Sequence, residues 1–450
     1  MKCYIYIITW LFNMQLRLRL IASTIFLMSN VLCDYAMANR TYDSFSIDAD
    51  ATVNIGFNYP TTGPYRAIGI QQKRGAHLAV DEINTAGGIL KHQIHLIEWN
   101  SQSNPKITTH NVTQMIKKDQ VQMVFGGSSS AVALAASAVC KHHKIPFFAT
   151  LAYANEITGS QANRFTFREC YNTRMAAKAL TTYLRTNLSD KTYFYITADY
   201  LWGHSTEAAF RSQSNTTDTA IHKSVLVPFP ASYNDIWDAL QTAKRANPKV
   251  LILVLLGNEM VTALKLATIM NLKTTMAIIV PSITLEMAVG AGPKAIEDVI
   301  STTPWLWEVP YKYNYPKGQQ FVANFFARYG SYPSTAAASA YSIVYEYKAA
   351  VERAKSFIGT KVVTALEDHT YQITKDPQTW RAFDHQSLQT VYVVQGKFRP
   401  RAINAHSRQE GYFEILNTVP GKKVALTQKQ WKKLRRKAQR SPTLETLPTP

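Results

Sequence analysis

Residues Gly126 to Ser130 read Gly-Gly-Ser-Ser-Ser, and they are the part of this sequence whose residue types most directly suggest chemistry. A serine nucleophile on a strand-to-helix turn uses the motif Gly-x-Ser-x-Gly, but the closing glycine is absent here. A phosphate-binding P-loop needs a lysine after its last glycine, and none follows. What remains is a helix start, where free N–H groups and the hydroxyls of Ser128 and Ser129 can hold a carboxylate. Plain capping of the helix by these serines explains the same residues, and the local sequence leaves both interpretations open.

Other residues of catalytic or metal-binding type show no supporting pattern. His204, His222 and His385 could complete a catalytic triad in space, but nothing in their spacing marks them. His92 and His95 lie three apart on an expected strand, so their side chains face opposite sides of the sheet. A dinucleotide fingerprint is also absent. We therefore expect no enzyme activity, no metal and no cofactor.

The segments around the serines alternate between short apolar runs typical of strands and stretches with the apolar spacing of one helix face. Strands with continuous apolar residues are separated by helices of ten to fifteen residues, which predicts βαβ units and parallel sheets. We expect strands at Thr52–Phe57, Ile94–Trp99, 121–125, 145–150, Tyr193–Ala198, around Val225, at Val250–Leu256 and at 276–281. We expect helices at Arg74–Ala86, Pro105–Lys118, about 130–140, from His204, at Tyr233–Ala246 and at Glu259–Met270. The series restarts near residue 193, so the fold class is α/β with two successive lobes.

Composition fits a large folded protein with an unusual C-terminus. The chain has 450 residues, of which 46% are hydrophobic, and a formal charge of +19. Residues 421–450 carry nine Lys or Arg against the single acid Glu445, so much of the charge lies in this segment and not on a nucleic-acid-binding face. We interpret it as a solvated tail with a short helix around Trp431; contact with anionic lipid or a partner is the alternative. Cys140 and Cys170 follow the predicted leader, either as a pair or as two separate buried thiols.

The N-terminus has the pattern of a cleaved signal peptide. Arg17 and Arg19 form a short basic start, and residues 20–32 are an apolar run too short to span a bilayer comfortably. The sequence Ala-Met-Ala at residues 36–38 is typical of a cleavage site, so we expect cleavage after Ala38. The mature protein is therefore predicted to be exported, and the resemblance described next implies that it is periplasmic.

Five stretches, in order along the chain, resemble one known family. They are Gly63–Ile89, Phe125–Thr158, Phe167–Thr173, Ile196–Gly203 and Phe383–Phe398. Together they resemble the periplasmic branched-chain amino-acid-binding proteins, the solute receptors of ABC importers. The resemblance implies two Rossmann-like lobes with parallel sheets, joined by a three-segment hinge, which is the type I periplasmic binding protein fold. The three crossings are expected near 168–169, near 309–313 and near Thr374.

The resemblance also implies an organisation and a mechanism. It divides the chain into a signal peptide (1–38), lobe I (45–168 with 311–375), lobe II (169–310 with 376–415) and a basic C-terminal tail (416–450). A monomer is expected to capture a small ligand between its lobes by hinge closure and to present it to a membrane permease. A ligand sensor or regulator on the same fold is the alternative, and a serine hydrolase ranks below it.

The site residues implied by the resemblance come from both lobes. Ser128 and Ser129 correspond to the family's contacts with the ligand carboxylate. The other implied ligand-binding residues are Leu151, Ala152, Tyr153, Tyr65, Glu169, Tyr200, Trp202, Asn258 and Ser282, with Ile68 beside Tyr65 on the first loop. Leucine-type binders carry an acid near the position of Ser282, and here Glu286, Glu259 and Glu169 are the available replacements. The expected ligand is therefore an amino acid, an amide, a urea-like compound or a short carboxylate.

Overall fold

The computed structural model describes residues 51–188, 191–398 and 411–447, which belong to one compact unit beginning at Ala51. The predicted signal peptide and its cleavage site lie outside these residues. Within the described ranges, no helix is long and apolar enough to cross a membrane.

Lobe I is built on a five-stranded parallel sheet of order β2-β1-β3-β4-β5. Its strands are β1 (Thr52–Tyr59), β2 (Gln93–Asn100), β3 (Val124–Gly126), β4 (Phe147–Ala149) and β5 (Thr166–Arg168), with helices α2 (Arg66–Thr85), α3 (Pro105–Lys117) and α4 (Ser130–His143) between them. Two separate apolar cores border this sheet, one that includes residues of α2 and one that includes residues of α3 and α4. Helices on both faces leave the strand ends as the accessible edges of the sheet.

Lobe II is built on a seven-stranded sheet of order β15-β14-β10-β9-β8-β6-β7. Its strands are β6 (Tyr193–Ala198), β7 (Lys223–Val227), β8 (Val250–Val254), β9 (Ala277–Val280), β10 (Ile300–Thr303), β14 (Val391–Gly396) and β15 (Phe413–Val419). Its helices are α5 (Thr173–Leu188), α6 (Leu201–Ser214), α7 (Tyr233–Ala246), α8 (Asn258–Ile269), α9 (Leu285–Ala291) and α10 (Pro293–Ile296). The apolar run of β8 is buried at every position between β6 and β9, as a central parallel strand requires. Only β14 runs against the other strands of this sheet, since it pairs antiparallel with both β10 and β15.

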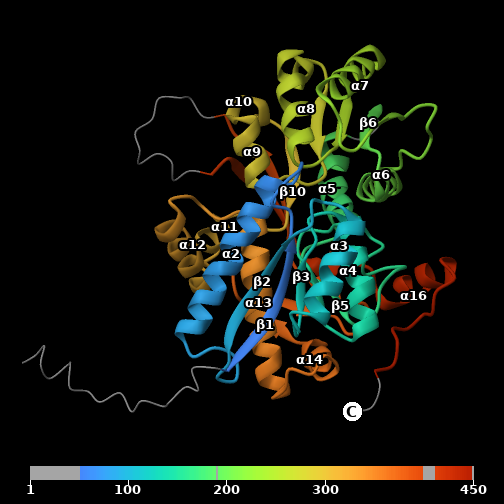
Figure 1. Ribbon diagram of the computed structural model, residues 1–450. Coiled ribbons are helices and arrows are strands. Elements are labelled where there is room, and N and C mark those ends of the chain that lie inside the picture. Colours follow the sequence, from blue (N-terminus) through green and yellow to red (C-terminus); the bar gives the residue numbers. More distant parts are fainter. Residues whose placement is uncertain (1–50, 189–190, 399–410, 448–450) are drawn as a thin grey trace, which may run out of the picture. The chain divides into compact units, whose positions relative to one another are not determined.

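The chain returns to lobe I after β10, and a small third sheet lies near the hinge. Helix α13 (Thr335–Ala354) packs on α2, with α12 (Pro316–Tyr329) and α14 (Gly359–Leu366) beside it, and Figure 1 shows these orange helices alongside the blue α2. The short helix α11 (Val309–Lys312) precedes them. The small sheet consists of β11 (Thr370–Tyr371), β12 (Gln378–Trp380) and β13 (Ser387–Leu388). The chain thus passes between the two large sheets at 169–172, at 304–315 and just before β14.

The sequence prediction of α2 was too short at its start. The helix begins at Arg66 and not at Arg74. Its first turns contain polar residues and Gly69, where a Cβ atom would lie 1.9 Å from the carbonyl oxygen of Pro60. Ile68 is buried in these turns, but the next buried positions are Gly69 and Gln72, so the apolar stripe from which the helix was predicted is interrupted there.

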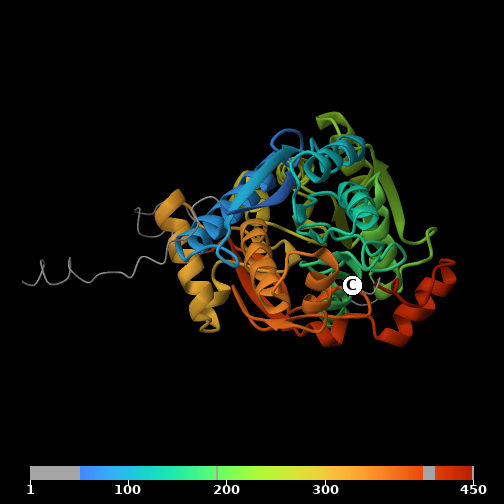
Figure 2. The same ribbon diagram turned by 60° about the horizontal axis from the view of Figure 1, so that its bottom comes forward.

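The prediction of a solvated C-terminal tail was wrong. After β15, the short helix α15 (Gly421–Val424) places Val424 and Ala425 in the core of lobe II. Helix α16 (Gln428–Lys437) then packs on lobe I, where Trp431 is only 1% exposed. Figures 1 and 2 both show α16, in red, at the edge of the molecule. The helix itself was expected, but its tertiary contacts were not.

The two cysteines are free thiols. Cys140 lies in the core beneath α4, and Cys170 lies in the core of lobe II. Burial raises the pKa of both thiols well above their ordinary value, so both stay protonated and behave as small apolar side chains.

Candidate functional site

The predicted site residues lie on loops that follow the carboxyl ends of parallel strands in both lobes. In lobe I these loops follow β1, β3, β4 and β5, and in lobe II they follow β6, β8 and β9. Of the predicted residues, Asn258 is exposed and Tyr200 is partly buried, whereas the others are buried. The carboxyl edge of an open parallel sheet is where α/β proteins bind ligands.

The serine loop begins with a turn that only glycine can make. Gly126 has φ +135°, and a Cβ atom there would lie 2.1 Å from the carbonyl oxygen of Asn58. Gly127 also has a positive φ, of +86°. Helix α4 then starts at Ser130, with Ser129 as its N-cap residue, and the Ser129 side chain makes no capping hydrogen bond. The Ser129 side chain therefore does not cap helix α4.

A chain of hydrogen bonds fixes the proton of Ser128. The carbonyl of Gly126 can only accept, so the Thr150 hydroxyl donates to it at 3.0 Å. Thr150 Oγ1 then accepts from Gln72 Nε2 at 2.5 Å, which turns Gln72 Oε1 toward Ser128. Ser128 Oγ donates to this oxygen at 3.0 Å. The hydroxyl of Ser128 is thus held within lobe I and presents its lone pairs to any further partner.

An aromatic cluster joins the two lobes at one end of the site. The Tyr65 hydroxyl of lobe I lies 2.6 Å from the Tyr200 hydroxyl of lobe II. Phe229, which follows β7, stacks on both rings, with centroid distances of 5.6 Å to Tyr65 and 4.5 Å to Tyr200. Gly257 has φ +64°, and a Cβ atom there would lie 2.8 Å from both Pro64 and Tyr65. The lobes are therefore in direct contact here.

A second group of contacts joins the lobes around Tyr153. Its ring lies 5.2 Å from that of Tyr171, whose hydroxyl is hydrogen-bonded to Ser282 Oγ (2.9 Å) and to Thr302 Oγ1 (3.0 Å). Ser334, at the start of α13, donates to Glu286 Oε1 at 2.5 Å. Further polar contact comes from the Asn155 backbone N–H, which donates to Ser205 Oγ at 3.1 Å. With the aromatic cluster, these contacts describe two lobes closed on each other.

Four buried polar atoms beside these contacts have no hydrogen-bond partner among the described residues. They are Trp202 Nε1, Glu259 Oε2, Glu286 Oε2 and the Tyr153 hydroxyl, which interacts with Ser282 but makes no hydrogen bond of good geometry. Tyr153 and Trp202 are 1% and 2% exposed, and Glu259 is 4% exposed. A buried polar group without a partner costs about 1–3 kcal/mol, so a cluster of them in one region indicates a place that a bound molecule completes.

The two carboxyl groups in this set have altered acidity. Burial raises the pKa of Glu259 to about 7, opposed only by a hydrogen bond from the Ala231 backbone N–H, 3.0 Å from Glu259 Oε1. Burial also raises the pKa of Glu286, against the hydrogen bond from Ser334. Glu259 interacts electrostatically with Tyr65 and Tyr200, and Glu286 with Tyr153. Each carboxyl group therefore accompanies one of the two interlobe contacts.

Glu169 differs from these two acids although sequence reasoning grouped them together. Its Oε2 accepts from Ser339 Oγ at 2.6 Å, and its Oε1 accepts from Gln378 Nε2 at 3.1 Å. Both oxygens are thus bound by residues of α13 and β12 at the hinge. Leu151 and Ala152 are buried on the loop after β4, and the carbonyl of Ala152 accepts from Arg168 Nη1 at 3.3 Å.

Several residues of the site were missed from the sequence. Gln72 and Thr150 orient Ser128, Phe229 stacks between the tyrosines, and Tyr171 binds Ser282. Phe229 could have been found, because it follows a strand that ends at the same edge as β6. Gln72 could not, since it lies in the polar first turns of α2.

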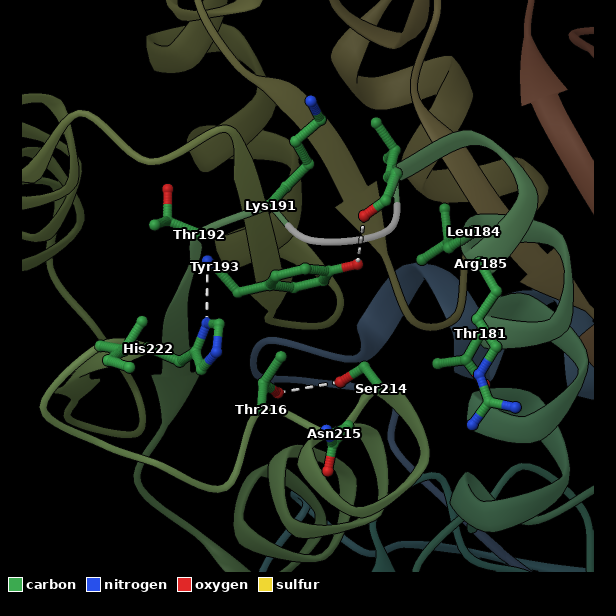
Figure 3. A pocket seen from close by; sticks show the side chains of 12 residues that line it. Thr181, Leu184, Arg185, Lys191, Thr192, Tyr193, Ser214, Asn215, Thr216 and His222 are labelled. Carbon is green, nitrogen blue, oxygen red and sulfur yellow. Dashed lines mark hydrogen bonds between the residues drawn. The ribbon is translucent and has the colours of Figure 1, made fainter.

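A separate cavity of about 440 Å³ lies at the opposite end of lobe II (Figure 3). It is bordered by the end of α5, the start of β6 and the end of α6, and the Tyr193 backbone N–H donates to His222 Nδ1 across it at 3.2 Å. Its lining residues are Thr181, Leu184, Arg185, Leu188, Lys191, Thr192, Tyr193, Ser214, Asn215, Thr216, Ile221 and His222. Because it lies at the amino ends of the strands, it is not the predicted site.

Comparison with known proteins decides the family. The sequence profile described as periplasmic binding protein matches residues 52–401, which include all of the lobe I sheet and every strand of the lobe II sheet except β15. The chain belongs to the periplasmic binding protein family. Residues 411–447 of the described chain, with β15, α15 and α16, lie beyond this match.

Individual members of the periplasmic binding protein family are similar to this chain, either in the sequence of one segment or in the structure of most of the chain. The Leu/Ile/Val-binding protein homolog 8 of Brucella abortus is 38% identical over 109 residues, which are 24% of this chain and 27% of that protein. The match therefore spans only about a quarter of this relative's length. A periplasmic binding protein of Burkholderia mallei has a TM-score of 0.75 at 23% identity, over 84% of this chain and 97% of its own. An ABC transporter solute binding protein of Rhodopseudomonas palustris in complex with 3,4-dihydroxy benzoic acid has a TM-score of 0.71 at 16% identity, over 82% of this chain and 98% of its own. These structures share the two-lobed fold.

The hydroxyls of Ser128 and Ser130 in the serine loop bond to groups within lobe I. Ser128 donates to Gln72, and Ser130 Oγ accepts from the Ala154 backbone N–H at 3.1 Å. His204 is bonded to Asp199 and His385 to Glu367, each at 2.8 Å. Among the hydrogen bonds of the described residues, none joins a histidine to a serine of this loop, and no cluster of potential metal ligands was found there.

Proposed function

We propose that this protein captures a small polar solute between its two lobes and presents it to the membrane permease of an ABC importer. One observation carries this proposal: buried donors and acceptors without partners lie beside the contacts that close the lobes. A polar ligand at this place supplies the missing hydrogen bonds and thereby favours the closed form over the open one. The protein acts in this role as a binding protein and not as an enzyme.

The unpartnered atoms favour a ligand with both an acceptor and a donor end. Tyr153 and Trp202 offer two donors, and Glu259 and Glu286 offer two carboxyl oxygens. The nearby cation Arg168 is already used, since its Nη1 donates to the carbonyls of Ala152 and Ala154. An α-amino acid or a primary amide matches this set, because its oxygen atoms can accept while its nitrogen donates to a carboxyl group.

The same atoms argue against a ligand that is only an anion. A carboxylate without an ammonium or amide group places its charge near two carboxyl groups, with no free lysine or arginine among the site residues named above. The Brucella relative carries a Leu/Ile/Val-binding name, whereas the Rhodopseudomonas structure holds 3,4-dihydroxy benzoic acid. Between an amino acid and a simple aromatic carboxylate, the two carboxyl groups of Glu259 and Glu286 favour the amino acid, because its ammonium group can pair with them.

Closure is proposed to occur in two steps. Lobe I has a preformed wall, because Gln72 and Thr150 hold Ser128 in one orientation. The ligand binds this wall first, near the start of α4. Tyr200, Trp202 and the two acids of lobe II then close over it, as hinge motion about the crossings allows. The closed monomer is the form that the permease recognises.

The family places the protein outside the cytoplasm, and we propose export through the signal peptide at residues 1–38. Edman sequencing of the exported protein should begin at Asn39. A start elsewhere would correct the cleavage site without affecting the binding proposal.

A thermal-shift screen with four ligand classes tests the proposed function. Amino acids, primary amides, ureas and simple carboxylates, including 3,4-dihydroxybenzoate, are compared at equal concentration. A ligand present at 100 times its Kd adds about 2.7 kcal/mol to the free energy of unfolding. We expect a rise in Tm with an amino acid or amide and none with the simple carboxylates. Stabilisation by the carboxylates alone would contradict the proposed ligand class, and no response to any class would contradict the proposed function.

A further inference from the structure

The C-terminal helix α16 is held on lobe I by two buried side chains. Trp431 donates from Nε1 to the carbonyl of Thr158 at 2.8 Å. Arg435 donates from Nη1 to the carbonyls of Gly159 and Ala162 at 2.9 and 3.1 Å, and its guanidinium lies 4.9 Å from the Trp431 ring centre. Because these residues are four apart, they lie on one face of the helix. That face is fixed against the protein, so the opposite face is fixed outward.

The outward face of α16 is cationic. Lys429, Lys433 and Arg436 follow the spacing i, i+4, i+7, which places them together on the side opposite Trp431, and all three are exposed. Lys437 and Arg440 are also exposed, and Lys432 is half-buried. Lys422 and Lys423 of α15 add two further exposed cations. We call these eight residues the basic face: Lys422, Lys423, Lys429, Lys432, Lys433, Arg436, Lys437 and Arg440.

The basic face is not neutralised within the described protein. Glu445 is the one acid in residues 421–447, and it is used by lobe I, where it pairs with Lys141 and accepts from the Arg164 backbone N–H at 2.9 Å. None of the ion pairs found among the described residues includes a member of the basic face.

Like charges on neighbouring turns make the basic face unfavourable for the helix alone. Lys429 and Lys433 are four residues apart, as are Lys432 and Arg436, and such pairs destabilise a helix. Elsewhere the chain places acids opposite bases at this spacing, as in the pair Lys348–Glu352. The repulsion in α16 is relieved when an external anion lies against the face.

We infer that the basic face docks the protein on an anionic lipid surface. Six of its eight residues are lysines, which act as point charges and suit diffuse negative charge better than bidentate recognition. The one aromatic residue of 421–447, Trp431, is buried, so the face offers no stacking platform for nucleic-acid bases. It also lacks an exposed aromatic anchor of the kind that dominates protein interfaces. Docking of this kind would hold the solute-binding lobes near a membrane permease.

Vesicle flotation with residues 39–450, which contain the whole compact unit from Ala51 onward, tests the inference. Vesicles of phosphatidylcholine alone are compared with vesicles containing phosphatidylglycerol, at low salt and at 0.5 M NaCl. The test variant carries Lys429→Gln, Lys433→Gln, Arg436→Gln and Lys437→Gln. The control variant removes the same number of exposed charges from lobe II, with Lys223→Gln, Lys244→Gln, Arg245→Gln and Lys249→Gln.

We expect the unaltered protein to float with the anionic vesicles only, and to be released by salt. Each lost charge should weaken binding roughly fivefold, so the four substitutions of the test variant should together weaken it by about 600-fold, while the control stays within about twofold. Circular dichroism should show both variants folded, because the altered side chains are exposed. Equal binding to both vesicle types, or an equal loss in the control, would overturn the inference. So would binding to single-stranded DNA without binding to vesicles.

Discussion

The hinge and the proposed ligand contact, which comprises Tyr153, Trp202, Glu259 and Glu286, both bury charged groups, but the hydrogen bonds of these groups are complete at the hinge and incomplete at the proposed contact. At the hinge, Arg168 donates from Nε to Gln386 at 2.7 Å and from its other nitrogens to the Ala152 and Ala154 carbonyls and to Thr158. Glu169 has both oxygens bound. At the ligand contact, Glu259 and Glu286 each keep one buried oxygen without a partner among the described residues.

The difference separates two uses of buried charge. A buried charge whose hydrogen bonds are complete fixes one arrangement of the crossings, since any other arrangement leaves it unpaired. A buried charge whose bonds are incomplete destabilises the empty closed form and is relieved by a ligand. The hinge residues should therefore control stability, and the contact residues should control affinity.

The largest effect is expected from Arg168→Ala, which removes the centre of the hinge network. The substitution leaves several buried acceptors unpaired and a cavity behind, so the free energy of unfolding should fall by about 3–5 kcal/mol. Urea denaturation followed by circular dichroism measures the change. Arg66→Ala, at an exposed position of lobe I, serves as the control and should differ little from the unaltered protein. If Arg168→Ala lost affinity without losing stability, hinge residues would not control stability as expected.

Glu259→Gln should lower ligand affinity and leave the free energy of unfolding unchanged, the reverse of the result expected for Arg168→Ala. An amide at this position cannot pair with a ligand ammonium as a carboxylate does, so affinity at pH 8 should fall by about 1.5–3 kcal/mol, or roughly 10- to 150-fold. Stability should not fall, because the amide is neutral in a buried place. Isothermal titration calorimetry with the ligand found by screening measures the affinity. Glu169→Gln is the matched comparison, and there stability should fall.

The pH dependence gives an independent test of Glu259. Burial raises its pKa from 4.5 to about 7, so the folded protein binds more protons than the unfolded chain between these values. Its contribution to stability therefore declines as pH rises from about 4.5 through 7, whereas affinity for an ammonium ligand rises over the same range. Glu259→Gln should reduce this rise in affinity, and the part that remains is expected from Glu286, whose pKa burial also raises. Glu346 in lobe I also has a pKa raised to about 7, so the affinity, and not the stability, is the discriminating measurement.

The fold was largely predictable because its elements obey simple periods. The strands β6 and β8 and helix α7 were predicted nearly to their ends, since continuous apolar runs and amphipathic helices leave clear patterns. The docking of α16 was missed, because a single tryptophan in a run of basic residues carries no information about what covers it. Trp431 is buried by a hydrogen bond from its Nε1 to the carbonyl of Thr158 and by a ring contact with Phe383, and both partners are distant in sequence.

The roles of individual acids were not predictable. Glu169, Glu259 and Glu286 were equivalent candidates from sequence, and the structure separates them by partners that lie far away in the chain, such as Ser339 for Glu169 and Ser334 for Glu286. For the serine loop, the chemistry of a helix start left ligand binding and simple capping equally open, and family resemblance favoured the ligand. The orientation of Ser128 by Gln72 is a tertiary property that spacing does not encode.

Ser128→Ala tests whether the preformed wall of lobe I contributes to affinity. The Ser128 proton is already donated to Gln72, so its loss should weaken ligand binding by only about 1–1.5 kcal/mol, less than the loss of a charged partner. Titration calorimetry measures the affinity, and Tm should also fall, because the buried Gln72 Oε1 loses its donor. Ser137→Ala in α4 is a suitable control, because its hydroxyl bonds to Thr166 and not to the site. Equal affinity in Ser128→Ala and the unaltered protein would remove Ser128 from the site.

The smallest effect is expected at the hydrogen bond between Tyr65 and Tyr200, which joins the lobes without charge. Tyr65→Phe leaves the Tyr200 hydroxyl buried and without this partner in the closed form, so closure, and with it affinity, should weaken by about 0.5–1.5 kcal/mol. Tyr200→Phe should act similarly. The double variant removes both hydroxyls and keeps the stacking on Phe229, so its affinity should recover toward that of the unaltered protein. Additive losses in the double variant would show that each hydroxyl contacts the ligand and not the other tyrosine. The role of Tyr65 and Tyr200 would then be to bind the solute and not to close the lobes.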